Sequence, residues 1–203
     1  MKIAIEGMDG VGKTTIAKMI ADNNKMIYIE KPLTNLFEPE DKDGKKILER
    51  VSKKIYEFDD EIIKAWFFGM GNIYTFLKYK ESDLVIDRHF ASNYFWNGTE
   101  RTDIIFKTMV ELIGKPDITI ILYASIKTRM HRLYKRNPND YDLTDKEKHV
   151  VGYDKMIKFL SDYNIPFIII DTEGKDKEAV YNEVNEFVKK LKDKQNTKKL
   201  VKE

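Results

Sequence analysis

The 203-residue sequence predicts an α/β fold with three layers, in which helices cover both faces of a parallel sheet. Five short apolar runs alternate with longer segments of helical periodicity, and this alternation is typical of βαβ units. Each run is apolar almost without interruption, as expected for strands that are covered on both faces. The sequence shows no internal repeat and no second-domain boundary, so we expect a single domain.

The predicted elements follow one another in a regular order. Strands are predicted at residues 3–6, 26–30, 84–87, 118–123 and 167–170. Helices are predicted at residues 13–21, 45–58, 62–78, 103–113, 127–136 and 146–160. A last helix carries one apolar stripe with a period near 3.6 residues, formed by Val180, Val184, Phe187, Val188 and Leu191. Residues 32–44 and 137–144 are predicted as loops, and the Lys-rich residues 193–203 as a solvated tail.

The composition excludes several classes of function. The chain has 36 Lys and Arg residues against 34 Asp and Glu, so its formal charge of +2 gives no field that favours nucleic acid or an anionic membrane surface. The absence of Cys excludes disulfides, thiolate metal sites and Cys nucleophiles. No apolar stretch reaches the roughly 18 residues that a membrane helix needs. We therefore expect a cytoplasmic protein that binds neither nucleic acid nor membrane.

A glycine-rich loop follows the first predicted strand and opens the first predicted helix. Its residues Gly7-Met8-Asp9-Gly10-Val11-Gly12-Lys13-Thr14 fit the phosphate-binding pattern G-x-x-x-x-G-K-[ST]. Backbone N–H groups can converge on phosphate oxygens there, Lys13 can reach the β and γ phosphates, and the Thr14 hydroxyl can bind Mg²⁺. The predicted ATP-binding residues are Gly7, Asp9, Gly10, Val11, Gly12, Lys13, Thr14 and Thr15.

A second signal lies where the third predicted strand ends. The apolar residues 84–86 run directly into a carboxylate and a guanidinium, Asp87 and Arg88. Asp87 is placed to provide a second ligand near Mg²⁺, and Arg88 can bridge phosphate oxygens bidentately. The two residues could instead form a structural ion pair. Beside a phosphate-binding loop, we favour the interpretation that they bind metal and phosphate.

The third signal is a basic cluster on one predicted helix, which comprises Arg129, Arg132, Lys135 and Arg136. Arg132 and Arg136 are four residues apart and share a helix face, so a lid over about residues 132–144 could present both to a transferring phosphoryl group. Basic residues near a helix C-terminus are also favoured by the helix dipole without any ligand. We predict that Lys13, Arg88, Arg132 and Arg136 are catalytic.

These motifs together resemble the thymidylate kinase family. Residues 5–15 are similar to the family's opening loop, including the acidic residue at Asp9 that deoxynucleoside kinases lack. Asp87-Arg88-His89-Phe90-Ala91-Ser92 resembles the family's Asp-Arg-Tyr-x-x-Ser, and Phe95-Trp96-Asn97-Gly98 parallels its Ala-Tyr-Gln-Gly. The resemblance spans roughly residues 3–190. It implies a P-loop NTPase fold with strand order 2-3-1-4-5 and a kinase domain over residues 1–192.

The resemblance also implies an activity, which is the Mg²⁺-dependent transfer of the γ-phosphoryl group of ATP to a (deoxy)nucleoside monophosphate. Lys13 and Arg88 would bind phosphates, and Thr14 and Asp87 would organise Mg²⁺. Asp9 would hold a sugar hydroxyl of the acceptor, and the arginines of the lid would stabilise the transferring charge. A homodimer is compatible with the resemblance.

The acceptor side of the sequence departs from the family. Residues 30–34 read Glu-Lys-Pro-Leu-Thr where the family has Arg-Glu-Pro-Gly-Gly, Leu48 stands at an Arg position, and residues 62–74 offer only Lys64 as a cation. The predicted acceptor-binding residues are Asp9, Lys31, Trp66, Ser92, Trp96 and Asn97. Two alternatives stay open: a deoxynucleoside kinase, and a nucleotide-binding switch without a small-molecule acceptor.

Overall fold

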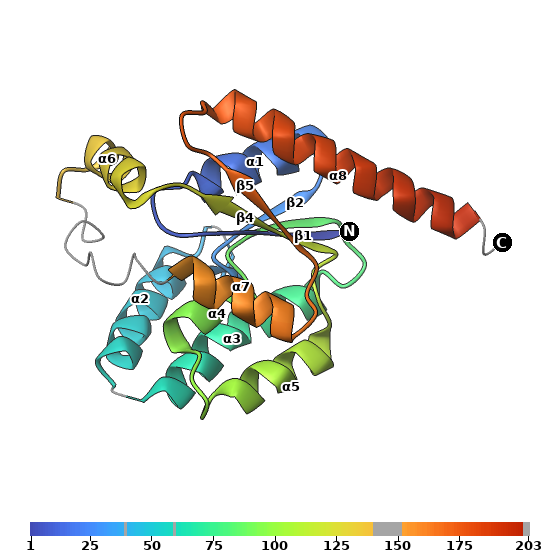
Figure 1. The fold of residues 1–203 in the computed structure, drawn as a ribbon. Helices are drawn as coiled ribbons and strands as arrows, with labels where there is room; N and C mark the ends of the chain where they lie inside the picture. Colours follow the sequence, from blue (N-terminus) through green and yellow to red (C-terminus); the bar gives the residue numbers. More distant parts are fainter. Residues whose placement is uncertain (39, 59, 140–151, 201–203) are drawn as a thin grey trace.

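The computed structural model describes residues 1–38, 40–58, 60–139 and 152–200. Its five strands form one parallel sheet in the order β2-β3-β1-β4-β5, which confirms the expected order (Figure 1). The strands are β1 (Lys2–Glu6), β2 (Ile27–Glu30), β3 (Leu84–Asp87), β4 (Ile118–Tyr123) and β5 (Phe167–Asp171). In the register of the sheet Ile5 lies beside Asp87, and Glu6 lies beside Ile121. This register brings Glu6 and Asp87 to the same edge.

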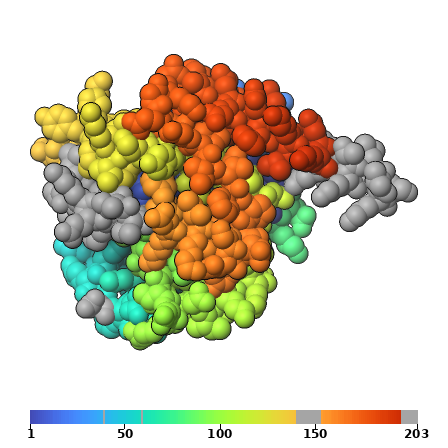
Figure 2. Space-filling model, in the orientation of Figure 1, coloured from blue at the N-terminus to red at the C-terminus, as the bar shows by residue number. Residues whose placement is uncertain are grey.

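Helices cover both faces of the sheet, as the apolar strands predict (Figure 1). The helices α1 (Lys13–Asn24) and α8 (Lys177–Leu200) lie on one face. The other face carries α2 (Lys42–Glu57), α3 (Glu61–Lys78), α4 (Phe90–Asn97), α5 (Asp103–Ile113) and α7 (Gly152–Asp162). A 3₁₀ helix, η1, spans Pro32–Leu36, and α6 (Ile126–Arg136) follows β4 at one end of the sheet. Figure 2 shows α8 running along one side of the body.

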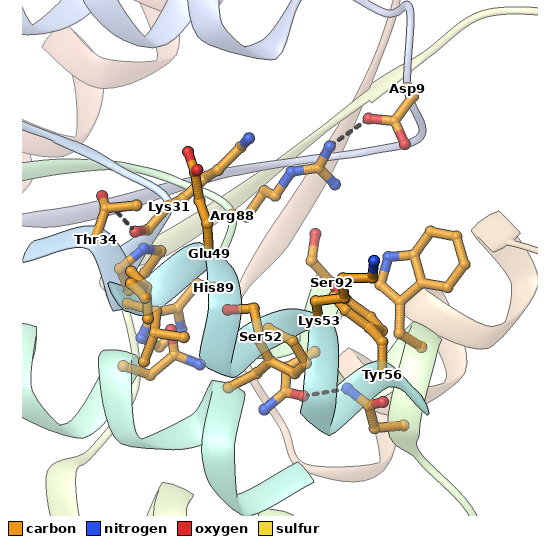
Figure 3. Close-up of a pocket in the computed structure, with 18 of the residues that line it drawn as sticks. Asp9, Lys31, Thr34, Glu49, Ser52, Lys53, Tyr56, Arg88, His89 and Ser92 are labelled. Atoms are coloured by element: carbon orange, nitrogen blue, oxygen red, sulfur yellow. Dashed lines mark hydrogen bonds and ion pairs between the residues drawn. The ribbon is translucent and has the colours of Figure 1, made fainter. Parts of the chain in front are cut away.

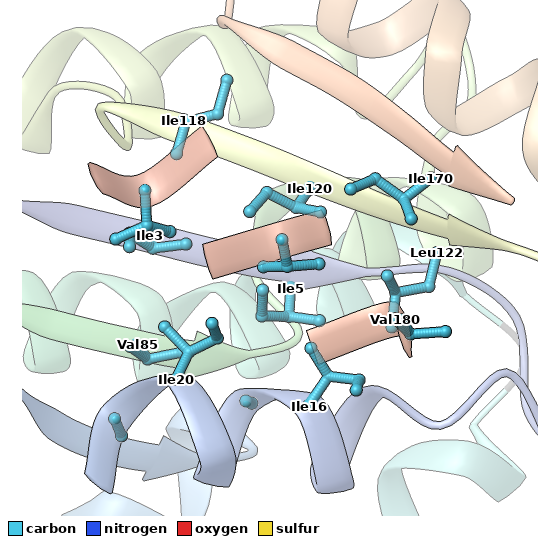
Figure 4. Close-up of a cluster of buried hydrophobic side chains, with 14 of the residues drawn as sticks. Ile3, Ile5, Ile16, Ile20, Val85, Ile118, Ile120, Leu122, Ile170 and Val180 are labelled. Atoms are coloured by element: carbon cyan, nitrogen blue, oxygen red, sulfur yellow. The ribbon is translucent and has the colours of Figure 1, made fainter. Parts of the chain in front are cut away.

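The two larger apolar cores follow from the alternation of side chains along the strands. On one face, Ile3 and Ile5 of β1 pack with Ile16 and Ile20 of α1 and with Val180 of α8 (Figure 4). These side chains are almost fully buried. The core on the opposite face joins residues of α3, α4, α5 and α7, including Phe90, Phe106, Met109 and Phe159. The sheet is therefore held from both sides, and its strand ends are fixed in space.

Short polar side chains begin three of the helices. Asp41 accepts a hydrogen bond from the backbone N–H of Gly44 at 2.7 Å, which caps α2. Asp60 caps α3 through Ile62, and Ser125 caps α6 through Thr128. Such caps satisfy N–H groups that have no partner within the helix. They set the residue at which each helix starts.

The structure corrects several of the expected elements. The predicted loop at residues 32–44 contains η1 and the start of α2 at Lys42. Helix α4 was not predicted, because its eight residues are rich in aromatic side chains and carry no clear helical stripe. Helix α1 continues to Asn24, and α8 continues to Leu200, nine residues beyond the apolar stripe that ends at Leu191. Residues 140–144 of the predicted loop and 146–151 of the predicted helix lie outside the described residues.

Within the described residues, none of the helices combines the length and apolar character that a membrane span requires.

Candidate active site

The glycine-rich loop lies between the C-terminal end of β1 and the start of α1. Gly7, Gly10 and Gly12 all have positive φ angles, of 132°, 87° and 96°. A side chain at Gly7 would collide with the backbone oxygen of Leu122, and one at Gly10 with that of Arg129. Gly12 precedes α1 without a side-chain cap, so the first N–H groups of the helix point into the loop. This backbone can receive phosphate oxygens, as predicted.

Lys13, Asp9 and Arg88 form a charged cluster over this loop. The Nζ atom of Lys13 donates a hydrogen bond to the backbone oxygen of Met8 at 2.9 Å and lies 3.6 Å from Oδ1 of Asp9. The guanidinium of Arg88 forms an ion pair with the same Oδ1 atom. Burial lowers the pKa of Lys13 to about 8, and the positive charge of Arg88 adds to this effect. Asp9 therefore holds both cations at the loop.

The structure also brings Thr14 and Asp87 together. The Thr14 hydroxyl donates to Oδ2 of Asp87 at 2.5 Å, and the Tyr28 hydroxyl lies 3.5 Å from the same oxygen. Asp87 is only 2% exposed, and its Oδ1 atom has no hydrogen-bond partner among the described residues. A buried carboxylate oxygen without a partner, beside a hydroxyl oxygen, fits Mg²⁺, which binds one or two protein oxygens together with phosphate oxygens. The predicted metal-binding pair fits this ion.

Arg88 has a left-handed backbone, with φ of 73°, and Glu6 stabilises the chain that follows it. The Oε1 atom of Glu6 accepts the backbone N–H groups of His89 at 2.8 Å and Ser92 at 3.1 Å. The Ser92 hydroxyl donates to Oε2 of the same carboxylate. Glu6 is fully buried, and burial raises its pKa against the opposing effect of these hydrogen bonds. Glu6 thus caps α4 from the neighbouring strand and fixes the position of Arg88.

A cavity of about 1020 Å³ opens beside the charged cluster (Figure 3). Five of the six predicted acceptor-binding residues line it: Asp9, Lys31, Ser92, Trp96 and Asn97. Trp66 does not line the cavity, because it lies on another face of α3, where its side chain is 43% exposed. Phe68, two residues later on α3, lines the cavity in its place.

Helix α2 forms a further wall of the cavity and carries none of the six predicted acceptor-binding residues. Its lining residues repeat at helical spacing: Leu48, Glu49, Ser52, Lys53, Tyr56 and Glu57. Tyr56 and Lys53 are exposed side chains, so no apolar pattern marked this face for the interior. The charged residues on this face of α2 are typical of a solvated helix surface.

The other inner wall is uncharged and polar. Asn72 is 2% exposed, His89 3%, Asn93 6% and Asn97 4%, and all four side chains line the cavity. The Asn93 amide donates to the backbone oxygen of Ala65 at 3.1 Å. The Asn97 amide in turn donates to the Asn93 side chain at 2.8 Å. Burial lowers the pKa of His89 to about 3, so its imidazole is neutral.

The three arginines in the basic cluster of α6 lie in three different environments. Arg132 donates to Oγ1 and to the backbone oxygen of Thr172, after β5, at 2.9 and 2.7 Å. Arg136 is exposed at the end of α6. Arg129 is 1% exposed, and its Nε atom donates to the backbone oxygen of Ala124 at 3.2 Å. Arg132 and Arg129 therefore fasten α6 to the sheet, while the predicted lid from residue 140 onward lies outside the described residues.

The comparisons with known proteins agree with this geometry. The thymidylate kinase family model matches residues 5–184. The chain belongs to the thymidylate kinase family. It is 31% identical over 195 residues to a probable thymidylate kinase of Methanocaldococcus jannaschii, covering 94% of this chain and 97% of the relative. A thymidylate kinase of Brachyspira hyodysenteriae is 24% identical over 200 residues, covering 94% of each chain. Family membership makes the chain a nucleotide kinase that uses ATP as phosphate donor.

Solved structures share the fold of this thymidylate kinase family member. A deoxyadenosine kinase from M. mycoides, with dCMP and dCDP bound, superimposes with a TM-score of 0.62 at 20% identity, covering 94% of this chain and 100% of that chain. A thymidylate kinase from Ehrlichia chaffeensis superimposes with a TM-score of 0.59 at 19% identity, covering 93% and 98%. At these identities the likeness establishes the architecture of the kinase, and the acceptor must be argued from its own side chains.

Proposed function

We propose that the chain transfers the γ-phosphoryl group of MgATP to a deoxynucleoside monophosphate bound in the cavity. One observation carries this proposal: Asp9 belongs to the glycine-rich loop and Arg88 follows β3, yet both side chains line the cavity. A phosphate on the loop and an acceptor in the cavity would therefore meet at these two residues. Phosphoryl transfer needs this positioning and charge neutralisation more than it needs a nucleophilic side chain.

Different groups at the glycine-rich loop and at the end of β3 would bind different parts of the donor. The N–H groups at the start of α1 and the Lys13 ammonium would bind phosphate oxygens, and Thr14 and Asp87 would hold Mg²⁺. When bound, Mg²⁺ neutralises charge on the phosphate oxygens. Arg88 would exchange its ion pair with Asp9 for a phosphate, which frees the Asp9 carboxylate to accept a hydroxyl of the acceptor sugar.

The cations of the cavity support a monophosphate acceptor. Lys31 and Lys53 line the cavity together with Arg88, although none of the guanidinium groups that the family places on the acceptor side is kept there. A lysine offers a point charge rather than a fork, so it can bind a phosphate without fixing its orientation. Two such charges beside Arg88 would hold a phosphate that approaches along the acceptor side.

A deoxynucleoside kinase is the second candidate, and the carboxylates of the cavity favour it. Glu49 and Glu57 line the same space as the lysines, and a carboxylate repels a phosphate while it accepts hydrogen bonds from a hydroxyl. The two candidates differ in whether the acceptor is a nucleoside monophosphate or an unphosphorylated nucleoside.

A coupled assay of ADP release tests the proposal, with the four deoxynucleoside monophosphates and the four deoxynucleosides as acceptors. Turnover should be stimulated by at least one monophosphate, and phosphorus NMR of the product should show a diphosphate. A monophosphate formed from a nucleoside would establish the second candidate. Tight ATP binding without stimulation by any acceptor would instead indicate a nucleotide-binding switch.

We further propose a cytoplasmic homodimer that binds neither nucleic acid nor membrane. Exposed apolar side chains on the neighbouring helices α3 and α5 support the dimer, since a second copy would cover Trp66, Met70, Leu77, Ile104 and Leu112. Sedimentation of the wild type and of the variant Leu112→Glu tests this assembly. A monomeric wild type would refute it.

A further inference from the structure

The glycine-rich loop lies directly on two residues, Leu122 near the end of β4 and Arg129 in α6. A Cβ atom at Gly7 would lie 2.4 Å from the backbone oxygen of Leu122, and one at Gly10 would lie 2.7 Å from that of Arg129. Contacts this close leave the loop no space to move toward these residues, so their positions determine where the loop lies. A group that holds Leu122 and Arg129 therefore also positions the backbone N–H groups that would bind phosphate.

Tyr153, in the first turn of α7, contacts both of these residues. Its hydroxyl donates a hydrogen bond to the backbone oxygen of Leu122 at 3.1 Å, and this is the oxygen that faces Gly7. The Arg129 guanidinium lies over the Tyr153 ring, with its carbon Cζ 5.8 Å from the ring centroid. The ring also packs against both of the larger apolar cores, which fixes its position. Tyr153 thus connects the two residues on which the loop lies.

The Tyr153 hydroxyl lies where β1 and β4 separate. The two strands are paired up to Glu6, the last residue of β1, and the chain then turns into the loop at Gly7. Burial raises the pKa of Tyr153 to about 12, and the backbone N–H groups of Met8 and Ala124 oppose this effect because they interact with the same oxygen. The hydroxyl therefore interacts with the end of β4 and with the loop at the same time.

The Arg129 side chain is fixed between the end of β4 and Tyr153. It is 1% exposed, and its Nε atom donates to the backbone oxygen of Ala124 at 3.2 Å. Burial lowers the pKa of Arg129, and the negative charge of Asp9 opposes this effect. Because Asp9 belongs to the loop, this buried cation lies within electrostatic range of the site that would bind phosphate.

A second tyrosine, directly after α7, is held in a similar way but does not contact the residues under the loop. The Tyr163 hydroxyl donates to the backbone oxygen and to Oδ1 of Asp103, at 3.0 and 2.7 Å. Like Tyr153, it is a half-buried side chain whose ring packs on a neighbouring aromatic side chain, here Phe159. Asp103 begins α5 and is not part of the loop. Tyr163 is therefore a matched control for Tyr153.

We propose that Tyr153 is a positioning residue for ATP, which holds Leu122 and Arg129 and thereby keeps the glycine-rich loop in the conformation that binds the phosphates. Tyr153 does not need to touch ATP for this role, because it acts through the two residues under the loop. The inference goes beyond the proposed function, since it concerns the donor and holds for any acceptor.

Equilibrium binding of ATP to the full chain tests the proposal, measured by calorimetry without acceptor. The variant Tyr153→Phe keeps the ring and removes the hydroxyl, so it should weaken ATP binding by about 3- to 10-fold. The variant Tyr163→Phe makes the same chemical change and should leave ATP binding within about twofold of wild type. The Tm should fall by about 2–5 °C in both variants, because each loses the hydrogen bonds of one hydroxyl.

Amide hydrogen exchange of residues 7–13 provides a second readout, which reports on the loop itself. In the protein without ATP, the loop should exchange faster in Tyr153→Phe than in wild type, and at the wild-type rate in Tyr163→Phe. The variant Tyr153→Leu also removes the ring beside Arg129, so it should exceed Tyr153→Phe in both readouts. If Tyr153→Leu does not fold, the comparison of the two Phe variants decides.

Two outcomes would overturn the proposal. Equal weakening of ATP binding in Tyr153→Phe and Tyr163→Phe would do so, because a general loss of stability would explain both. Wild-type ATP binding in a Tyr153→Phe variant with a lowered Tm would limit the hydroxyl to stability. The binding measurement needs no acceptor, so its result is independent of whether the proposed acceptor is correct.

Discussion

The donor side and the acceptor side of the active site are built in different ways. The donor side uses eight consecutive residues, 7–14, and the pair at 87–88, and much of its binding surface is backbone. Its key side chains are buried, with Lys13 5% and Asp87 2% exposed. The acceptor side uses side chains spread over residues 31–97, from η1, α2, α3 and α4. Backbone geometry therefore fixes the donor, whereas individual side chains decide the acceptor.

This difference means that the two sides should respond differently to substitution. A change on the donor side should abolish transfer for every acceptor, because phosphate binding and charge neutralisation are common to all of them. A change on the acceptor side should alter the ranking of acceptors and leave ATP binding intact.

The largest effect is expected from Lys13→Ala. The Lys13 ammonium lies over the loop, where it would neutralise charge on the transferring phosphoryl group, so its loss should lower kcat by about 100- to 1000-fold for all acceptors. The Tm should change by only a few degrees, since its one hydrogen bond is to a loop carbonyl. Lys189→Ala on the exposed surface of α8 is the control. Turnover of Lys13→Ala within about tenfold of wild type would contradict the assignment of the loop.

The second effect concerns Asp9, which lies where the two sides meet. A carboxylate that accepts a hydrogen bond from the 3′-hydroxyl of the acceptor contributes about 1.5–3 kcal/mol. A 3′-deoxy acceptor should therefore react about 10- to 100-fold more slowly than its parent. Asp9→Ala should slow the parent and remove the difference between the two acceptors. The comparison of kcat/KM values for both acceptors and both proteins is a double-mutant cycle, and additive effects would argue against the contact.

The backbone conformation of the glycine-rich loop could be predicted from the sequence, because the residues that determine it are contiguous. A glycine pattern between a strand and a helix specifies a backbone conformation, and the structure has positive φ angles at Gly7, Gly10 and Gly12. Asp87 was predictable for a related reason, since an apolar strand that ends in a carboxylate places this group at the edge of the sheet. The strand order followed from the family resemblance, and the structure confirms it.

The acceptor side was less predictable, because it depends on which face of each helix points toward the cavity. The aromatic residues of α3 do not by themselves reveal that Phe68 faces the cavity and Trp66 the surface. The residue at which Asp60 caps α3, and the packing of the helix, determine which of its faces points into the cavity. The apolar stripe of α2, formed by Ile47, Leu48, Val51 and Ile55, does not mark the wall, because only Leu48 of these four lines the cavity. Glu6 was missed for another reason: its three hydrogen bonds come from residues 89 and 92, and only the folded sheet brings them to it.

The third prediction uses Glu6 to connect the two sides. Glu6→Gln keeps the size of the side chain but replaces one acceptor oxygen by a donor, which opposes the hydroxyl of Ser92. Because Glu6 fixes the chain after Arg88, kcat should fall by about tenfold, while the KM for ATP changes little. Ser92→Ala removes one of the three hydrogen bonds and should have a smaller effect. A loss of Tm without a loss of kcat in the folded variant would limit Glu6 to stability.

The fourth prediction is a pH dependence that belongs to the donor side alone. The pKa of Lys13 is lowered to about 8, so the ammonium is charged below this pH and is lost as the pH rises through it. The value of kcat/KM for ATP should therefore fall above pH 8, approaching tenfold per pH unit. At saturating ATP the phosphates favour the charged form, so the fall in kcat should begin at a higher pH. A flat profile to pH 10 for kcat/KM would contradict this assignment.

The smallest effects are expected on α6, where the predicted catalytic arginines sit in different surroundings. Arg132→Ala and Arg136→Ala should each lower kcat by about 3- to 10-fold, more than they raise the KM for ATP, if they act as the site closes. Arg132→Ala should also lower the Tm, because its guanidinium makes two hydrogen bonds to Thr172. The control Thr172→Val removes one of these bonds and keeps the charge, so it should lower the Tm slightly and leave kcat near the wild-type value.

A change in the KM for ATP alone would make both arginines binding groups of the donor side. Equal losses of kcat in Arg132→Ala and Thr172→Val would show that Arg132 acts by fastening α6 to the sheet.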